Sequence, residues 1–237
     1  MRGRVAVVSP HLDDAVLSLG AAIALWTRGG AVVDVVTVFA GDTESTRPAS
    51  KWDRRAGFET EGSAVRARHE EDRLACSLVG AKPVWLPLAE AAYEAAHDAA
   101  AVRSALSQAV AGADAVLLPG PPLDHPDHAW LAALPPGDHW RGRIGVYLAQ
   151  PYAFRAAGRA EASSAGQDEP RWQHVRVGAR DRRAKWRACR AYRSQLPLLG
   201  LARPAHIPLL RLLWFEARSG GEALAWLPSR STTLSGP

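Results

Sequence analysis

The sequence predicts an α/β protein with a Rossmann-like, mostly parallel sheet and helices on both faces. Five short apolar runs alternate with longer segments of helical periodicity, which is the pattern of repeated β-α units. Several of these runs are apolar along their whole length, as in strands that are buried on both faces. In such sheets ligands bind beyond the carboxyl ends of the strands, so we expect the active site at that edge.

The predicted elements follow one another in the order β-α-β-α. The five strands are expected at residues 4–8, 31–39, 83–88, 115–119 and 144–148. The helices between them are expected at residues 14–26, about 64–78, 95–111 and about 126–134. Gly29 and Gly30 close the first helix and Gly80 the second, because glycine is favoured just beyond a helix end.

Other segments are less regular, and we expect all of them to belong to a single domain spanning residues 1–237. The connection 42–62 has no periodicity, and loops of that length in a compact domain are often functional. We expect a flexible loop, a basic helix, two apolar elements that could be strands or helices, and a disordered tail. The loop is expected at residues 156–170 and the basic helix at 181–198. The two apolar elements are expected at 207–215 and 223–227, and the tail at 229–237.

Composition excludes several classes of protein. The formal net charge of +5 comes mainly from scattered arginines, and no basic run is interleaved with aromatic residues, so nucleic acid is not an expected partner. No apolar stretch is long enough to span a membrane. The two cysteines lie far apart, which argues against a disulfide framework and favours a reducing, cytoplasmic compartment. The sequence leaves the oligomeric state open, including a homo-oligomer.

The first cluster of polar residues interrupts the apolar sequence VVSPHLDDAVLSLG. Asp13 or Asp14 could cap the following helix, since a carboxylate accepts backbone N–H bonds there. His11, three residues before Asp14 at a strand-to-helix turn, adds a second interpretation. Its imidazole and the Asp14 carboxylate can converge on one cation.

The second cluster is DHPDH, which follows the fourth predicted strand. Asp124 or His125 could cap a helix that has Pro126 at its first position. That interpretation does not explain why His125 and His128 are spaced to face the same way on the first turn.

Together the two clusters predict a catalytic zinc site with His11, Asp14 and His128 as ligands. Three protein ligands with an open position are typical of catalytic rather than structural zinc. Zinc activates water and polarises a carbonyl oxygen, which indicates metal-assisted hydrolysis. Asp13 is then placed as the general base, and His125 as a cation near the developing oxyanion.

The motifs HLDD (11–14) and HPDH (125–128) resemble the LmbE-like/PIG-L family of zinc-dependent N-acetylglucosamine deacetylases, often written HPDDE…HPDH. The resemblance extends to Arg68 with Glu71, and to the segment AKWRACRAYRSQ, so that it covers about residues 4–196. It implies the same ligands and base as above. It also implies that His125 stabilises the tetrahedral intermediate, that Asp127 tunes His125, and that Arg68 holds a sugar hydroxyl or a phosphate.

The sequence departs from the family pattern at Leu12, where proline is usual, and at Ala15, where glutamate is usual. Neither position is an expected ligand or base. Loss of the glutamate removes a carboxylate that could support a ligand, which puts the affinity for zinc in doubt.

Three further residues are candidates for substrate binding, and each has a plainer alternative. Trp52 could stack on a sugar ring or an apolar aglycone, or it could pack the long loop onto the body of the protein. Glu90, after the third strand, could bind substrate hydroxyls. Without the family resemblance, Arg68 would be read as a solvated charge on a helix face.

We therefore expect a zinc-dependent hydrolase that removes the N-acetyl group from a small N-acetylglucosamine-containing substrate. The acceptor could be an amino-sugar conjugate, a thiol precursor or a secondary metabolite. One alternative is a zinc-dependent esterase or phosphoesterase with the same ligands. Another is a non-catalytic domain that binds sugars or nucleotide sugars and uses the two clusters as helix caps.

Overall fold

The structure, a computed structural model, describes residues 1–94, 96–134, 140, 142–157, 171–201 and 207–228. Its strands are β1 (Arg4–Ser9), β2 (Val32–Thr37), β3 (Lys82–Trp85), β4 (Ala115–Pro119), β5 (Arg143–Tyr147), β6 (Gln173–His174) and β7 (Ala223–Trp226). Its helices are α1 (Asp14–Arg28), α2 (Lys51–Arg55), α3 (Glu61–Val79), α4 (Ala99–Ala109), α5 (Pro126–Ala133), α6 (Tyr152–Ala157), α7 (Ala179–Cys189) and α8 (Ile207–Arg218). No helix in the described ranges is long and apolar enough to cross a membrane.

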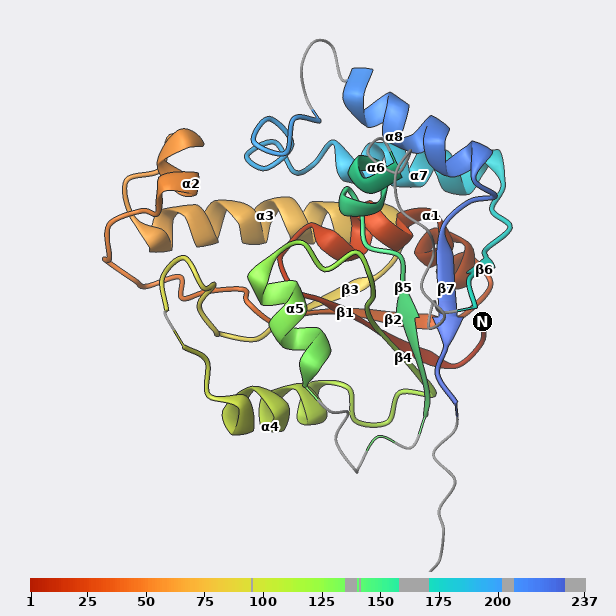
Figure 1. The fold of residues 1–237 in the computed structure, drawn as a ribbon, viewed down its shortest axis with the longest axis horizontal. Helices are drawn as coiled ribbons and strands as arrows, with labels where there is room; N and C mark the ends of the chain where they lie inside the picture. Colours follow the sequence, from red (N-terminus) through yellow and green to blue (C-terminus); the bar gives the residue numbers. More distant parts are fainter. Residues whose placement is uncertain (95, 135–139, 141, 158–170, 202–206, 229–237) are drawn as a thin grey trace, which may run out of the picture.

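The strands form one sheet in the order β3-β2-β1-β4-β5-β7-β6 (Figure 1). Strands β1 to β5 are parallel, and β7 and β6 add an antiparallel edge. The chain reverses the direction in which it builds the sheet between β1 and β4. Such a switch point is where α/β sheets bind ligands, and both histidine clusters follow these two strands.

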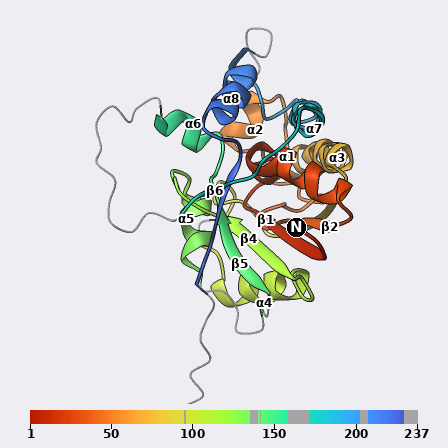
Figure 2. The same cartoon turned by 90° about the vertical axis from the view of Figure 1, so that its right-hand side faces the viewer.

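Two apolar cores confirm the predicted fold class. One lies between the sheet and helices α1, α3, α7 and α8, and it includes Val7, Leu17 and Ile23. The other lies on the opposite face under α4 and α5, and it includes Val8, Leu106 and Leu131. Figure 2 shows the two groups of helices on either side of the strands. The β1 residues alternate between the cores because successive side chains of a strand point to opposite faces.

The connection 42–62 is more ordered than its sequence indicates, because it contains α2. Ser50 caps this helix by accepting a hydrogen bond from the Asp53 amide. Thr60 caps α3 in the same way through the Ser63 amide, so α3 begins at residue 61 rather than 64. Asp98 caps α4, which begins at Ala99.

In the C-terminal part of the chain, the structure shows which of the two apolar elements is a helix and which is a strand. The apolar stretch 207–215 lies in helix α8, and the stretch 223–227 gives strand β7. The basic helix predicted to reach residue 198 ends at Cys189. Beyond it, Tyr192 and Ser194 turn towards α3 and donate hydrogen bonds to Asp72 and Glu71. Most of the loop predicted at 156–170 and the tail at 229–237 lie outside the described residues.

Candidate active site

The turn from β1 into α1 does not use its aspartates as helix caps. The Ser9 hydroxyl donates a hydrogen bond to the His11 carbonyl oxygen and accepts one from the Ala15 amide. The Asp14 carboxylate turns back and accepts a hydrogen bond from the His11 amide at 2.9 Å. Asp13 occupies the cap position without a side-chain cap bond. Both carboxylates are therefore left to face the carboxyl end of the sheet, where helix α1 contributes a positive dipole end.

Three predicted ligands converge at one point. The Asp14 Oδ2 atom lies 3.2 Å from His11 Nδ1 and 3.0 Å from His128 Nε2. A tetrahedral zinc ion with bonds of about 2.0–2.1 Å would separate its ligand atoms by about 3.3 Å, close to what is observed. The contact between His128 and Asp14 lacks the geometry of a hydrogen bond. Both ring nitrogens of His128, which is fully buried, have no hydrogen-bond partner among the described residues.

A buried polar atom without a partner is costly and calls for an explanation. A cation bound between His11, Asp14 and His128 would satisfy the imidazole that the protein leaves unpaired. The donor set of two imidazoles and one carboxylate is one that zinc accepts. The residues present therefore fit the metal that the sequence predicts.

His125 is a second candidate neighbour of the metal, since its ring nitrogens come within 4.8 Å of those of His11 and His128. Its Nδ1 atom, however, caps α5 by accepting a hydrogen bond from the Asp127 amide at 3.2 Å. The neutral ring then carries its proton on Nε2, which makes that atom a donor rather than a ligand. Asp14 is the better third ligand on this ground.

We expected His125 to be a cation and Asp127 to tune it. The structure differs on the charge, while the Asp127 carboxylate does favour the charged form of His125, though less strongly than burial and His11 oppose it. Burial, with the nearby His11, lowers the pKa of His125 to about 4, so the ring is neutral at pH 7. The Asp127 carboxylate lies 3.9 Å from His125 Nδ1 and instead accepts a hydrogen bond from His11 Nε2 at 2.9 Å. A carboxylate bonded to the outer nitrogen of a ligand histidine fixes its tautomer and orientation.

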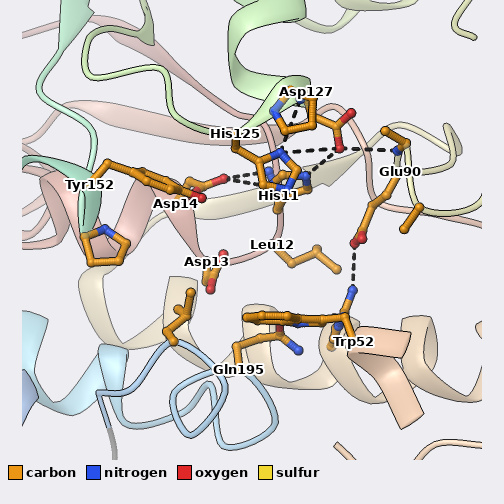
Figure 3. A pocket seen from close by; sticks show the side chains of 16 residues that line it. His11, Leu12, Asp13, Asp14, Trp52, Glu90, His125, Asp127, Tyr152 and Gln195 are labelled. Carbon is orange, nitrogen blue, oxygen red and sulfur yellow. Dashed lines mark hydrogen bonds and ion pairs between the residues drawn. The ribbon is translucent and has the colours of Figure 1, made fainter. Parts of the chain in front are cut away.

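The site lines a cavity of about 420 Å³. Figure 3 shows His11, Asp14, His125 and Asp127 on one side, Trp52 and Gln195 on the other, and Asp13 between them. The Asp13 carboxylate makes no hydrogen bond to any residue in the described part of the chain, so it is free to act on a bound molecule. Burial, reinforced by the negative charge of Asp14, raises the pKa of Asp13 to about 7.

Comparison with known proteins identifies the family. Residues 6–134, which include both histidine motifs, match the family model of PIG-L, described as GlcNAc-PI de-N-acetylase. The chain belongs to the PIG-L family. The match is shorter than the resemblance predicted over residues 4–196. A comparison with curated proteins finds no match.

Solved structures of deacetylases share the fold across nearly the whole chain. The A40926 pseudoaglycone deacetylase Dbv21 is 28% identical and has a TM-score of 0.77, with 95% of this chain and 97% of that chain covered. A deacetylase of the teicoplanin biosynthesis pathway is 24% identical, with coverages of 94% and 96% and a TM-score of 0.76. The N,N'-diacetylchitobiose deacetylase from Pyrococcus horikoshii is 20% identical, with coverages of 95% and 84% and a TM-score of 0.62. The last two support the fold alone.

Arg68, which the PIG-L resemblance assigns to substrate, is buried between two carboxylates. Its Nη1 atom donates to Glu90 at 2.6 Å, and its Nη2 atom donates to Asp53. Asp53 is fully buried and also accepts hydrogen bonds from Tyr93 and Ser50. Each terminal nitrogen spends one hydrogen on these carboxylates, and the buried Nε has no hydrogen-bond partner in the described residues, so the guanidinium keeps donors for a bound molecule. Its ion pairs also orient Glu90, which lines the cavity.

Trp52 lies at the wall of the cavity in a fixed position. Its indole nitrogen donates a hydrogen bond to Gln195 Oε1 at 3.0 Å, and α2 is tied to the body through Asp53. Both predicted roles of Trp52 are thus compatible with the structure, because the ring joins the loop to the body and also faces the cavity. Leu12, one of the departures from the family pattern, is buried and lines the same cavity.

Sequence reasoning missed two residues of this region. Tyr152, at the start of α6, lines the cavity and packs edge-on against the His128 ring, with 5.0 Å between ring centroids. His97 lies beside Asp127 on the other side of that carboxylate. Neither stands in a recognisable motif, and a lone histidine or tyrosine gives no signal of the tertiary contact that it makes.

Proposed function

We propose that this protein is a zinc-dependent N-deacetylase that acts on a small substrate containing N-acetylglucosamine. The observation that carries the proposal is His128, a fully buried imidazole without a hydrogen-bond partner in the described residues, beside Asp14 and 5.3 Å from His11 between ring centroids. Membership of the PIG-L family and the 28% identity to a pseudoaglycone deacetylase support the choice of an acetamide as the group attacked.

In this proposal His11, Asp14 and His128 hold the metal. When bound there, zinc supplies a Lewis acid that activates water and polarises the amide carbonyl. Asp13 accepts a proton from the attacking water and later returns a proton to the leaving amine nitrogen. The water oxygen first forms a C–O bond with the carbonyl carbon, and the C–N bond of the acetamide breaks afterwards as the amine nitrogen takes up the proton. The products are acetate and the free amino sugar.

His125 serves the reaction as a neutral donor. With Nδ1 occupied as the α5 cap, its Nε2–H group is available to the carbonyl oxygen as negative charge develops on it. A neutral imidazole next to a metal site avoids the repulsion that a cation would meet there.

The remaining wall of the cavity suits an uncharged sugar. Glu90, held by Arg68, offers carboxylate oxygens to sugar hydroxyls, and Trp52 offers an aromatic face to a ring or an apolar aglycone. The two carboxylates on Arg68 disfavour an anionic group at this end of the cavity.

The test is zinc content together with acetate release. We expect the purified protein to bind one zinc per chain and to release acetate from at least one member of a panel of free, nucleotide-linked and aglycone-linked N-acetylglucosamine compounds. His128→Ala should lose both properties. Zinc binding without acetate release, but with hydrolysis of acetate or phosphate esters, would favour an esterase or phosphoesterase. Absence of stoichiometric zinc would contradict the proposal.

A further inference from the structure

His97 is held in a fixed plane next to the candidate site. It lies in the connection between β3 and α4, and its side chain is 7% exposed. Its ring stacks on Phe39, with centroids 4.5 Å apart and an angle of 27°, and it meets the edge of Trp130 at 5.0 Å. Because the two aromatic rings leave the imidazole little rotational freedom, the direction of its nitrogens is set by packing.

The His97 side chain points towards Asp127. Its Nε2 atom lies 3.4 Å from Asp127 Oδ1, while Asp127 Oδ2 accepts hydrogen bonds from His11 Nε2 at 2.9 Å and from the Ala91 amide at 3.3 Å. The two oxygens of one buried carboxylate therefore face two different histidines. Since a carboxylate only accepts, the His97 Nε2 must carry a hydrogen for this contact.

The surroundings of Asp127 explain why a second contact matters. A second cavity, of about 300 Å³, is lined by Asp127 together with Ala91, Ala96, His97 and Trp130. Of these, His97 is the residue that holds the Oδ1 oxygen. Without its ring, the carboxylate would face a larger space and could rotate about χ2.

We infer that His97 is a positioning residue that fixes the plane of the Asp127 carboxylate and, through it, the orientation of the His11 imidazole. This inference rests on the proposed function, in which His11 is a metal ligand. Partners that orient a ligand histidine typically change metal affinity 10- to 100-fold when they are removed. His97 acts one residue further out, so we expect the lower end of that range, about tenfold.

The test compares zinc affinities measured by competition with a chromogenic chelator. His97→Ala should bind zinc about tenfold more weakly than the unaltered protein. His97→Gln, whose side-chain NH₂ group can replace the Nε2–H donor, should recover most of the loss. The Co²⁺-substituted protein should show an altered visible spectrum in His97→Ala and a nearly restored one in His97→Gln.

His69→Ala is the matched control. His69 also stacks on an aromatic ring, that of Trp85 at 4.0 Å, and its Nε2 is within 2.9 Å of the Ala40 carbonyl oxygen. It has no contact with Asp127. We expect a similar fall in melting temperature in both alanine variants but unaltered zinc affinity in His69→Ala.

The outcomes separate the two proposals. Equal zinc affinity in the unaltered protein and in His97→Ala would overturn the positioning role and leave the proposed function intact. Equal weakening in His69→Ala would also overturn it, because the effect would then be general destabilisation. If the unaltered protein binds no zinc, the proposed function itself fails.

Discussion

Two groups of buried charges in this molecule are built in opposite ways. The ion triad consists of Lys185 on α7, Glu216 on α8 and Glu222 before β7. The Lys185 Nζ atom lies 2.7–2.9 Å from three carboxylate oxygens of the two glutamates. Glu222 also accepts hydrogen bonds from the Ala21 and Ala22 amides. The triad thus satisfies its charges within the chain.

The geometry of α1 makes this satisfaction possible. Leu19 has non-helical dihedral angles, and the two amides that reach Glu222 lie two and three residues after it. A break of this kind frees backbone amides, which a carboxylate can then accept. Gly20 allows the Lys185 stem to approach, since a Cβ atom there would lie 2.9 Å from Lys185 Cγ.

The histidine cluster of the candidate site (His11, Asp14, Asp127 and His128) is also largely buried but is incomplete. His128 has no hydrogen-bond partner in the described residues, and the hydrogen bonds of that part of the chain include none to the neighbouring Asp13 carboxylate. Both groups consist of buried titratable side chains, so burial alone does not tell which of the two is a functional site. The difference teaches that unmet bonding capacity, rather than buried charge, distinguishes a functional site from a structural one.

The largest expected effect is that of Asp13→Asn on turnover. Because the amide cannot accept the proton, kcat should fall roughly 10³-fold, about 4 kcal/mol of barrier. Zinc content should be unchanged. The free energy of unfolding should stay the same or increase, since a buried carboxylate without a partner is removed. Acetate-release kinetics and urea unfolding measure the two quantities.

Asp34→Asn is the control for Asp13→Asn. Asp34 is also a buried aspartate, but it lies on β2 away from the cavity, and its Oδ2 atom pairs with Arg4 Nε at 2.7 Å. We expect this control to lose stability and to keep its kcat. A kcat in Asp13→Asn within tenfold of the unaltered protein would remove Asp13 from the role of base.

The main residues of the candidate site could be predicted from the sequence, whereas the contacts that support them could not. The site motifs are local, and parallel strands bring their carboxyl ends to one edge, so HLDD and HPDH predict their own juxtaposition. The contacts of Asp53 with Arg68 and of His97 with Asp127 join segments 15 and 30 residues apart in sequence. No periodicity or spacing rule encodes such contacts, because they depend on how α2 and the loop before α4 pack.

The buried ion triad could not be predicted from the sequence either. Lys185 appears in the sequence as one member of a basic helix, and such a residue is normally solvated. Its burial follows from α8, a segment whose type the apolar pattern left open between strand and helix. The capping role of His125 is local and was predicted as one of two alternatives, since the bond joins residues two apart. Its neutral charge was not predicted, because that depends on burial beside His11, which is a tertiary consequence.

The second effect in size is that of Lys185→Met on stability. Removing the cation leaves two buried carboxylates opposite each other, and breaking a buried ion group in this way costs about 3 kcal/mol. Urea unfolding should show this loss, while kcat and zinc affinity of the folded protein stay unchanged. The double variant Lys185→Met with Glu216→Gln should recover part of the loss, because one of the two charges is removed as well. A change in kcat with unaltered stability would show that the triad serves the reaction.

The smallest effect concerns pH. Burial, together with the negative charge of Glu222, outweighs the attraction of Lys185 and raises the pKa of Glu216 to about 7 from its usual 4.5. The folded state then binds this proton more tightly than the unfolded state, so between about pH 7 and pH 4.5 the group adds stability as pH falls. One proton contributes at most about 1.4 kcal/mol per pH unit.

Unfolding free energies measured from pH 5 to 8 should rise less steeply towards acid in Glu216→Gln than in the unaltered protein. Glu70→Gln, at a side chain that is 74% exposed on α3, should leave the profile as it is. Parallel profiles for Glu216→Gln and the unaltered protein would mean that Lys185 keeps Glu216 ionised throughout this range despite burial and the charge of Glu222.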